Sequence, residues 1–222
     1  MCGIAGLISL DTNPLPEDAG KRLFAMSASL AHRGPDDRGT WLSGDHRTGL
    51  AHTRLAIIDP TPEAHQPMIS AKGNAIVFNG EIYNYRELRE KYKLSVPMSD
   101  TAVLLALLDR HGERILSELR GFFTFAYWND STKELLIARD TIGKKPLYYA
   151  VRDNVLVFAS EARALVRSGL VTAAISGEAL REYLKYYSVP HPLSIFEGVM
   201  TLPAGCVMRV LLHATSPQCI DL

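Results

Sequence analysis

The 222 residues are 47% apolar and carry 24 basic and 24 acidic side chains, so the chain can bury a large core and has no net charge to attract nucleic acid or an anionic membrane. Its three cysteines, Cys2, Cys206 and Cys219, are too few and too scattered for a disulfide framework or a zinc cluster, which is typical of a reducing compartment. The apolar run of residues 2–10 has no positive charge before it, so we expect neither a signal peptide nor a spanning segment, and a cytoplasmic location.

Apolar residues and turn signals divide the first half of the chain into short strands and helices. The apolar run of residues 2–10 ends at the turn-forming residues 11–14, which is typical of a buried strand. Ser99-Asp100-Thr101 favours a helix start, and an apolar stripe with helical spacing follows it. We expect strands at residues 2–10, 49–53 and 74–79, and helices at residues 17–30, 85–94 and 102–110.

The second half of the chain changes to strand patterning. Residues 129–131 and 152–154 have the composition of hairpin turns, so consecutive strands are expected to form one antiparallel meander. Periodicity alone therefore indicates an α+β class. We expect these strands at residues 122–128, 134–139, 146–152 and 155–160, then helices at residues 161–168 and 176–187, and a last strand at residues 206–212, whereas residues 213–222 have no pattern that can be interpreted.

Cys2 combines a nucleophile and a base in one residue once the initiator Met1 is removed. A free thiol has a pKa of about 8.5 and an α-amino group one of about 7.7 to 8.0, so the neutral amine can take the thiol proton. With Met1 attached, that nitrogen is an amide and has no basicity. The alternative is a cysteine without a chemical role before a buried strand, and the first residues alone leave both interpretations open.

Short motifs occur along the chain in a defined order. They are Met1-Cys2-Gly3-Ile4, His32-Arg33-Gly34-Pro35-Asp36, Arg54-Leu55-Ala56-Ile57-Ile58-Asp59, Phe78-Asn79-Gly80-Glu81-Ile82-Tyr83-Asn84, Ser99-Asp100-Thr101, Gly121-Phe122-Phe123-Thr124-Phe125-Ala126, Arg139-Asp140-Thr141-Ile142-Gly143-Lys144-Lys145-Pro146-Leu147-Tyr148-Tyr149 and Phe158-Ala159-Ser160-Glu161. As an ordered set over residues 1–205, they resemble the glutaminase domain of glutamine-hydrolysing asparagine synthetases. The N-terminal cysteine is common to all class II glutamine amidotransferases, whereas the Arg-Gly-Pro-Asp and Asn-Gly-Glu-Ile-Tyr-Asn runs favour the asparagine-synthetase subfamily.

The resemblance implies the N-terminal-nucleophile (Ntn) hydrolase fold, a four-layer αββα sandwich of two antiparallel sheets flanked by helices. It implies a glutaminase domain over residues 2–205 and a tail over residues 206–222 at the start of a missing synthetase domain. ATP and magnesium would belong to that synthetase domain, so we expect no cofactor in these residues, and the seven histidines show no metal-ligand spacing. The expected activity is hydrolysis of glutamine to glutamate and ammonia, the glutaminase half of asparagine synthesis from aspartate.

The resemblance also implies roles for individual residues. Cys2 would attack the side-chain amide carbon of glutamine, while the Asn79 side-chain amide and the Gly80 backbone N–H would stabilise the oxyanion. Arg54 would bind the α-carboxylate, a task suited to a planar guanidinium. The other expected pocket residues are Glu81 and Asp100 near the α-ammonium, and Leu55 and Ile58 on the walls.

Several interpretations stay open from the sequence. Asn79-Gly80 is also typical of a tight turn, Asp100 of a helix cap, and Arg54 with Asp100 of a simple ion pair. For the whole chain, the alternatives are a non-catalytic truncated remnant that acts as a binding or interaction domain, and a glutaminase that serves another amide acceptor. The expected partners are glutamine and an ammonia-accepting synthetase domain or subunit, with no nucleic acid and no membrane, and a homodimer stays open.

Overall fold

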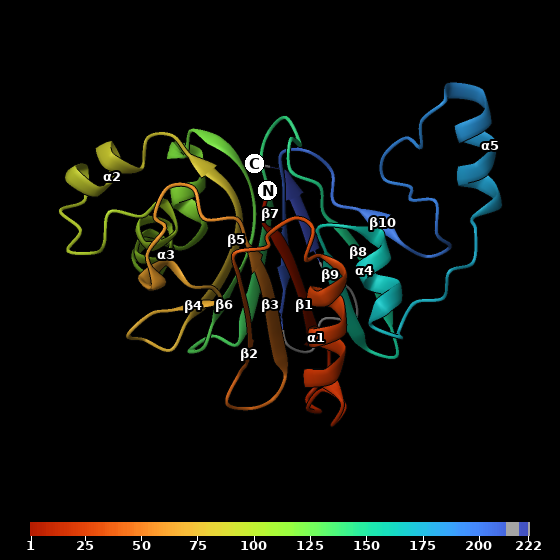
Figure 1. The fold of residues 1–222 in the computed structure, drawn as a ribbon, viewed down its shortest axis with the longest axis horizontal. Helices are drawn as coiled ribbons and strands as arrows, with labels where there is room; N and C mark the ends of the chain where they lie inside the picture. The colour runs from red at the N-terminus through yellow and green to blue at the C-terminus, as the bar shows by residue number, and fades with distance from the viewer. Residues whose placement is uncertain (212–217, 222) are drawn as a thin grey trace.

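The computed structural model describes residues 1–211 and, for the backbone alone, residues 218–221. Two six-stranded sheets stack face to face, and helices cover the outer face of each sheet (Figure 1). Every strand pairing in both sheets is antiparallel. The order of helix, sheet, sheet and helix confirms the predicted αββα sandwich.

The first sheet is built around β1 (Gly3–Ser9), whose seven residues are all buried. β1 pairs with β3 (Thr48–Arg54) on one side and with β9 (Val155–Ala159) on the other. Since Gly3 lies opposite Thr53, Cys2 is placed beside the end of β3 in the middle of the sheet. The remaining strands of this sheet are β2 (Asp37–Leu42), β8 (Tyr148–Arg152) and β10 (Met200–Thr201).

The second sheet is built around the long pair β5 (Ala75–Ile82) and β6 (Gly121–Asn129). They pair along their whole length, from Ala75 opposite Trp128 to Ile82 opposite Gly121. A strand over Cys206–Val210 begins directly after the predicted domain boundary at residue 205, while the boundary itself stays a prediction. The other strands of this sheet are β4 (Met68–Ile69), β7 (Glu134–Arg139), β11 (Cys206–Val210) and β12 (Gln218–Asp221).

Helices cover the outer faces in two separate groups. α1 (Ala19–Ser29) and α4 (Ala162–Arg167) pack on the first sheet, while α2 (Tyr85–Lys91) and α3 (Asp100–His111) lie on the side of the second sheet (Figure 1). α5 (Gly177–Tyr186) stands apart from the sandwich (Figure 1). Two short 3-10 helices occupy Pro62–Ala64 and Gly112–Glu118. No helix in the described part of the chain has both the length and the apolar character needed to cross a membrane.

One of three apolar clusters in the described structure lies between the two sheets. Because side chains alternate across a strand, each sheet turns one apolar face inward, and burial of each large side chain stabilises the fold by about 1.5 to 3 kcal/mol. The two inner faces make one cluster that includes Ile4, Ile8, Leu50, Val77, Trp128 and Phe158. This core holds β1 of the first sheet and β5 of the second sheet in fixed positions relative to each other.

The structure corrects two predictions made from the sequence and adds strands that were not predicted. The predicted meander is wrong, because β6 and β7 belong to the second sheet whereas β8 and β9 belong to the first. The strand predicted at residues 74–79 continues to Ile82, so Asn79 and Gly80 lie inside β5 and not at its end. β2, β4, β10 and β12 were not predicted, and residues 212–217 and 222 lie outside the described residues.

Candidate active site

A pocket of about 240 Å³ opens at one end of the sandwich. It forms where the start of β1 meets the end of β3 and where the end of β5 meets the start of β6. The start of α3 and the loop between β7 and β8 close its sides. All eight residues selected from the sequence line this pocket, namely Cys2, Arg54, Leu55, Ile58, Asn79, Gly80, Glu81 and Asp100.

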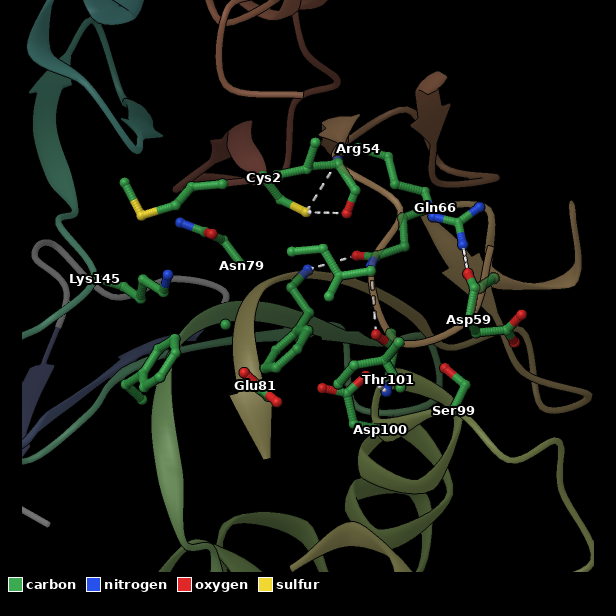
Figure 2. A pocket seen from close by; sticks show the side chains of 18 residues that line it. Cys2, Arg54, Asp59, Gln66, Asn79, Glu81, Ser99, Asp100, Thr101 and Lys145 are labelled. Carbon is green, nitrogen blue, oxygen red and sulfur yellow. Dashed lines mark hydrogen bonds between the residues drawn. The ribbon is translucent and has the colours of Figure 1, made fainter. Parts of the chain in front are cut away.

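The Cys2 thiol is held against the backbone that follows β3. The Leu55 N–H donates to Sγ at 3.4 Å, and the thiol donates to the Leu55 carbonyl at 3.7 Å (Figure 2). Arg33 Nε donates to the Cys2 carbonyl at 2.9 Å and fixes the backbone on the other side. Burial raises the pKa of the Cys2 thiol, while the Leu55 N–H and the N-terminal ammonium act in the opposite direction. Met1 is 56% exposed and also lines the pocket, so the free amine lies one residue away from the thiol as long as Met1 is present.

The Asn79 side chain is buried in the pocket with its amide nitrogen unpaired in the described structure. It is 1% exposed, and its Nδ2 has no hydrogen-bond partner among the described residues. A buried amide donor left unpaired costs about 1 to 3 kcal/mol, so this arrangement is unfavourable unless something in the pocket accepts the bond. Figure 2 shows the Asn79 amide near Cys2 on the same side of the pocket. Asn79 Nδ2 is therefore free to donate to an oxygen bound next to the sulfur.

The backbone N–H of Gly80 is also directed toward the pocket. The Phe78 N–H donates to Gln66 Oε1 and the Ile82 N–H donates to Asp100 Oδ2, both away from β6. N–H directions alternate along a strand, so the Gly80 N–H also points away from β6, past the end of the short β4 and toward the pocket. Gly80 itself is required by packing, since a Cβ there would lie 2.3 Å from the Phe122 carbonyl oxygen. Because Asn79 and Gly80 lie inside β5, they do not form the tight turn that the sequence left open.

A histidine fixes the peptide that precedes Asn79. His52 lies on β3 in the first sheet, and its Nε2 donates to the Phe78 carbonyl of β5 at 3.1 Å. Burial lowers the pKa of His52 to about 4, so the ring is neutral near pH 7 and carries its proton on Nε2. The two sheets are thus tied together one residue before the amide that faces Cys2.

Arg54 and Asp100 do not form the ion pair that the sequence left open. In the described structure, Arg54 donates instead to the carbonyls of Thr61, at 2.9 Å, and of Asp59. These two bonds leave other guanidinium N–H groups available. Asp100 accepts the backbone N–H groups of Ile82 and Thr101, so it holds the start of α3 against β5.

Two carboxylates lie together on the floor of the pocket. Burial, together with the neighbouring Glu81 charge, raises the pKa of Asp100 to about 6. Glu81 and Asp100 lie below Cys2 in Figure 2, and Arg54 lies on the opposite side. The pocket therefore combines a thiol, an unpaired amide donor, a guanidinium and two carboxylates, which suits a small zwitterion that carries a carbonyl group.

The loop after β3 carries the apolar wall. Leu55 and Ile58 are half-buried in the pocket. Asp36 Oδ2 accepts the Ala56 N–H at 2.8 Å, and Asp59 Oδ1 accepts the Thr61 N–H at 3.0 Å. Asp36 thus acts on the site through this loop, and it is not among the residues that line the pocket.

Comparisons with known proteins identify the family and agree with the fold. A family model described as a glutamine amidotransferase domain matches residues 1–219. The chain belongs to the glutamine amidotransferase family. The amidotransferase domain has the Ntn-hydrolase architecture of the class II enzymes, which confirms the family suggested by the sequence motifs.

Relatives extend well beyond this domain. The amidase chry2 of Gibberella zeae is 39% identical over 77% of this chain and 27% of its own length. The glutamine-hydrolysing asparagine synthetase 1 of Bacillus subtilis is 35% identical over 92% of this chain and 33% of its own length. The chain thus spans about a quarter to a third of these two relatives.

A solved structure supports the fold independently. Glutamine phosphoribosylpyrophosphate amidotransferase of B. subtilis, solved with ADP and GMP, superposes with a TM-score of 0.70 at 19% identity. It covers 99% of this chain and 49% of its own. At this identity the likeness bears on the fold alone, and it agrees with the two stacked sheets.

Several residues of the amidotransferase pocket were missed from the sequence. Gln66 follows a loop without periodicity, and Lys145 was given no role although it belongs to the motif of residues 139–149. Thr101 lies next to the selected Asp100, and its hydroxyl accepts from Gln66 Nε2 at 3.4 Å. The burial of Lys145 is visible only in the structure, so its place in the motif of residues 139–149 is the sequence signal that could have drawn attention to it.

Proposed function

We propose that this domain hydrolyses the side-chain amide of glutamine with Cys2 as the nucleophile, after removal of Met1. The observation that supports this most directly is the pairing of the Cys2 sulfur with an unsatisfied buried donor, Asn79 Nδ2, in one pocket. Because Asn79 Nδ2 makes no hydrogen bond in the described structure, no existing bond has to break before it donates to a bound oxygen on which negative charge develops.

The proposed reaction has two steps. Cys2 Sγ attacks the amide carbon while the α-amine of Cys2 takes the thiol proton, and the Asn79 amide and the Gly80 N–H stabilise the oxyanion. The C–N bond then breaks, and the protonated amine gives its proton to the departing ammonia. Water attacks the resulting thioester with the amine as base, which releases glutamate and restores the thiol. No step uses a cofactor or metal.

The amino-acid end of glutamine would lie across the pocket from Cys2. The free N–H groups of Arg54 would bind the α-carboxylate, and Asp100 with Glu81 would bind the α-ammonium. The aliphatic part of the substrate would pack on Leu55 and Ile58. Opposite charges at separate places in one pocket select a zwitterion over a simple amide.

The similarity to asparagine synthetases supports a role in asparagine biosynthesis. In this proposal, ammonia passes to a synthetase domain or subunit that uses ATP and magnesium to amidate aspartate. A cytoplasmic location fits a mechanism that requires a reduced thiol. The chry2 relative leaves another amide acceptor as the alternative.

The test is glutamate release by the purified chain, with removal of Met1 verified by intact mass. Cys2→Ala is expected to abolish release. Cys206→Ala is the matched control, because Cys206 is a buried cysteine in β11 that does not line the pocket. Equal loss in both variants, or no release from the processed wild-type chain, would contradict the proposal and favour a non-catalytic binding domain.

A further inference from the structure

The pocket contains a lysine that the proposed reaction does not use. Lys145 is 6% exposed and lines the pocket together with Cys2. Among the described residues, its Nζ has no hydrogen-bond or ion-pair partner. The ammonium lies 4.4 Å from the centroid of the Phe122 ring, a cation–π contact. Buried lysines are rare unless they are paired, so this one requires an explanation.

The loop that carries Lys145 is rigidly built. The Asp140 carboxylate accepts four backbone N–H groups, those of Phe123, Ile142, Lys144 and Lys145. On the other side of the loop, the Lys145 carbonyl accepts Arg139 Nε at 2.7 Å and Thr124 Oγ1 at 3.2 Å. Lys145 is therefore bonded at both ends of its backbone, and its side chain is directed over Phe122. Figure 2 shows its amino group on the Asn79 side of the pocket, away from Arg54 and Asp59.

We propose that Lys145 is an electrostatic positioning residue that acts through Cys2: its ammonium favours the thiolate and the neutral α-amine. A fixed positive charge stabilises a nearby anion and destabilises a nearby cation. Both effects favour attack, since the thiolate is the nucleophile and the neutral amine is the base. The inference rests on the proposed function for its catalytic consequence, whereas the state of the Cys2 thiol can be measured without any turnover.

The charges around both groups agree with this role. Lys145 and Arg54 both lower the pKa of the Cys2 thiol against the larger effect of burial. Burial, followed by the Arg33 charge, lowers the pKa of Lys145, while Cys2 and Asp140 raise it. The remaining charged groups of the pocket are Glu81, Asp100 and Asp59; in Figure 2, Asp59 and Asp100 lie across the pocket from Lys145, and Glu81 lies below it. The thiolate of Cys2 would therefore be the negatively charged partner of the Lys145 ammonium.

The experiment measures the rate of iodoacetamide alkylation of Cys2 against pH, followed by the mass of the N-terminal peptide of the processed chain. Only the thiolate reacts, so the midpoint of the profile reports the thiol pKa. Lys145→Met keeps the aliphatic stem over Phe122 and removes the charge, and we expect the midpoint to rise by about 0.5 to 1 pH unit. Lys145→Arg is expected to keep the wild-type midpoint.

Lys144→Met is the matched control, because Lys144 is the adjacent lysine but is exposed and does not line the pocket. Lys145→Gln is the second neutral variant should the methionine variant not fold. A midpoint in the folded neutral Lys145 variants equal to that of Lys144→Met would overturn the inference.

The acidic limb of glutaminase kcat/KM is expected to move to higher pH in the same variants. A shift in alkylation without any turnover in the wild type would preserve the inference and reject the proposed function. Wild-type turnover with no shift in the alkylation midpoint of the Lys145 variants would preserve the proposed function and reject the inference.

Discussion

Replacing Asn79 by alanine separates catalysis from stability. The side chain is almost fully buried, and its Nδ2 makes no hydrogen bond in the described structure. If Asn79 donates to the oxyanion, its loss removes one of two donors, which typically raises the barrier by about 2.7 to 4 kcal/mol. We therefore expect kcat for glutamine hydrolysis to fall about 100- to 1000-fold in Asn79→Ala, with a much smaller change in KM.

The stability of the same variant is expected to change little. Truncation loses some packing, but it also removes a buried donor whose desolvation costs about 1 to 3 kcal/mol. These effects oppose each other, so the free energy of unfolding should stay within about 1 kcal/mol of the wild type.

Asn74→Ala is the matched control, because Asn74 is a buried asparagine directly before the same strand with its polar atoms paired. Its Nδ2 donates to Asp109 and to the Tyr127 hydroxyl, and its Oδ1 accepts the Asp130 N–H. This control should lose about 2 to 4 kcal/mol of unfolding free energy and retain most of the glutaminase activity of each folded molecule.

The two quantities are measured by steady-state glutamate release and by urea denaturation of the same preparations. If Asn79→Ala kept wild-type kcat, the oxyanion assignment would be wrong. If its activity fell only in proportion to a large loss of stability, Asn79 would be a structural residue. The results for Asn74→Ala show the stability and activity expected of a purely structural loss next to this strand.

Four further predictions follow from the site and the proposed mechanism. Between about pH 4 and pH 6, Asp100 holds a proton in the folded state but not in the unfolded chain, so the free energy of unfolding falls as pH rises through this window. Relative to the wild type, Asp100→Asn should therefore gain up to about 3 kcal/mol of unfolding free energy between pH 4 and pH 7. Denaturant titration at each pH measures this difference. Because the ionised Asp100 would bind the substrate ammonium, the wild-type KM for glutamine should rise below about pH 6, and an unchanged KM would contradict this role. Gly80→Ala places a Cβ 2.3 Å from the Phe122 carbonyl oxygen and should lower the melting temperature by several degrees. Dialysis against EDTA should leave glutamate release unchanged, and a loss of release that a metal restores would refute the metal-free mechanism.

Local patterns in the sequence predicted most strands and helices because each pattern depends on neighbouring residues. The apolar run of β1 and the stripe of α3 are examples, and both elements lie where they were predicted. The assignment of strands to sheets was wrong because it depends on pairing between distant residues. β7 and β8 follow each other in sequence, yet the loop held by Asp140 carries the chain from one sheet to the other.

The site could be predicted as a set of residues but not as an arrangement. Ordered motifs selected eight residues, and the structure brings them to one pocket. Motifs could not show that β5 runs on to Ile82, that Asn79 Nδ2 is unpaired, or that Arg54 bonds to its own loop, because these facts depend on tertiary contacts. β2 was missed because Asp37–Leu42 is a polar edge strand whose only fully buried residue is Gly39.

The central claim is that the thiol and the free α-amine of Cys2 act as one unit. The most direct measurement compares glutamate release by one preparation before and after an aminopeptidase removes Met1, with the processed fraction read from intact mass. We predict that release rises in proportion to the fraction of chains that begin at Cys2. Equal rates from chains that keep Met1 would contradict the account.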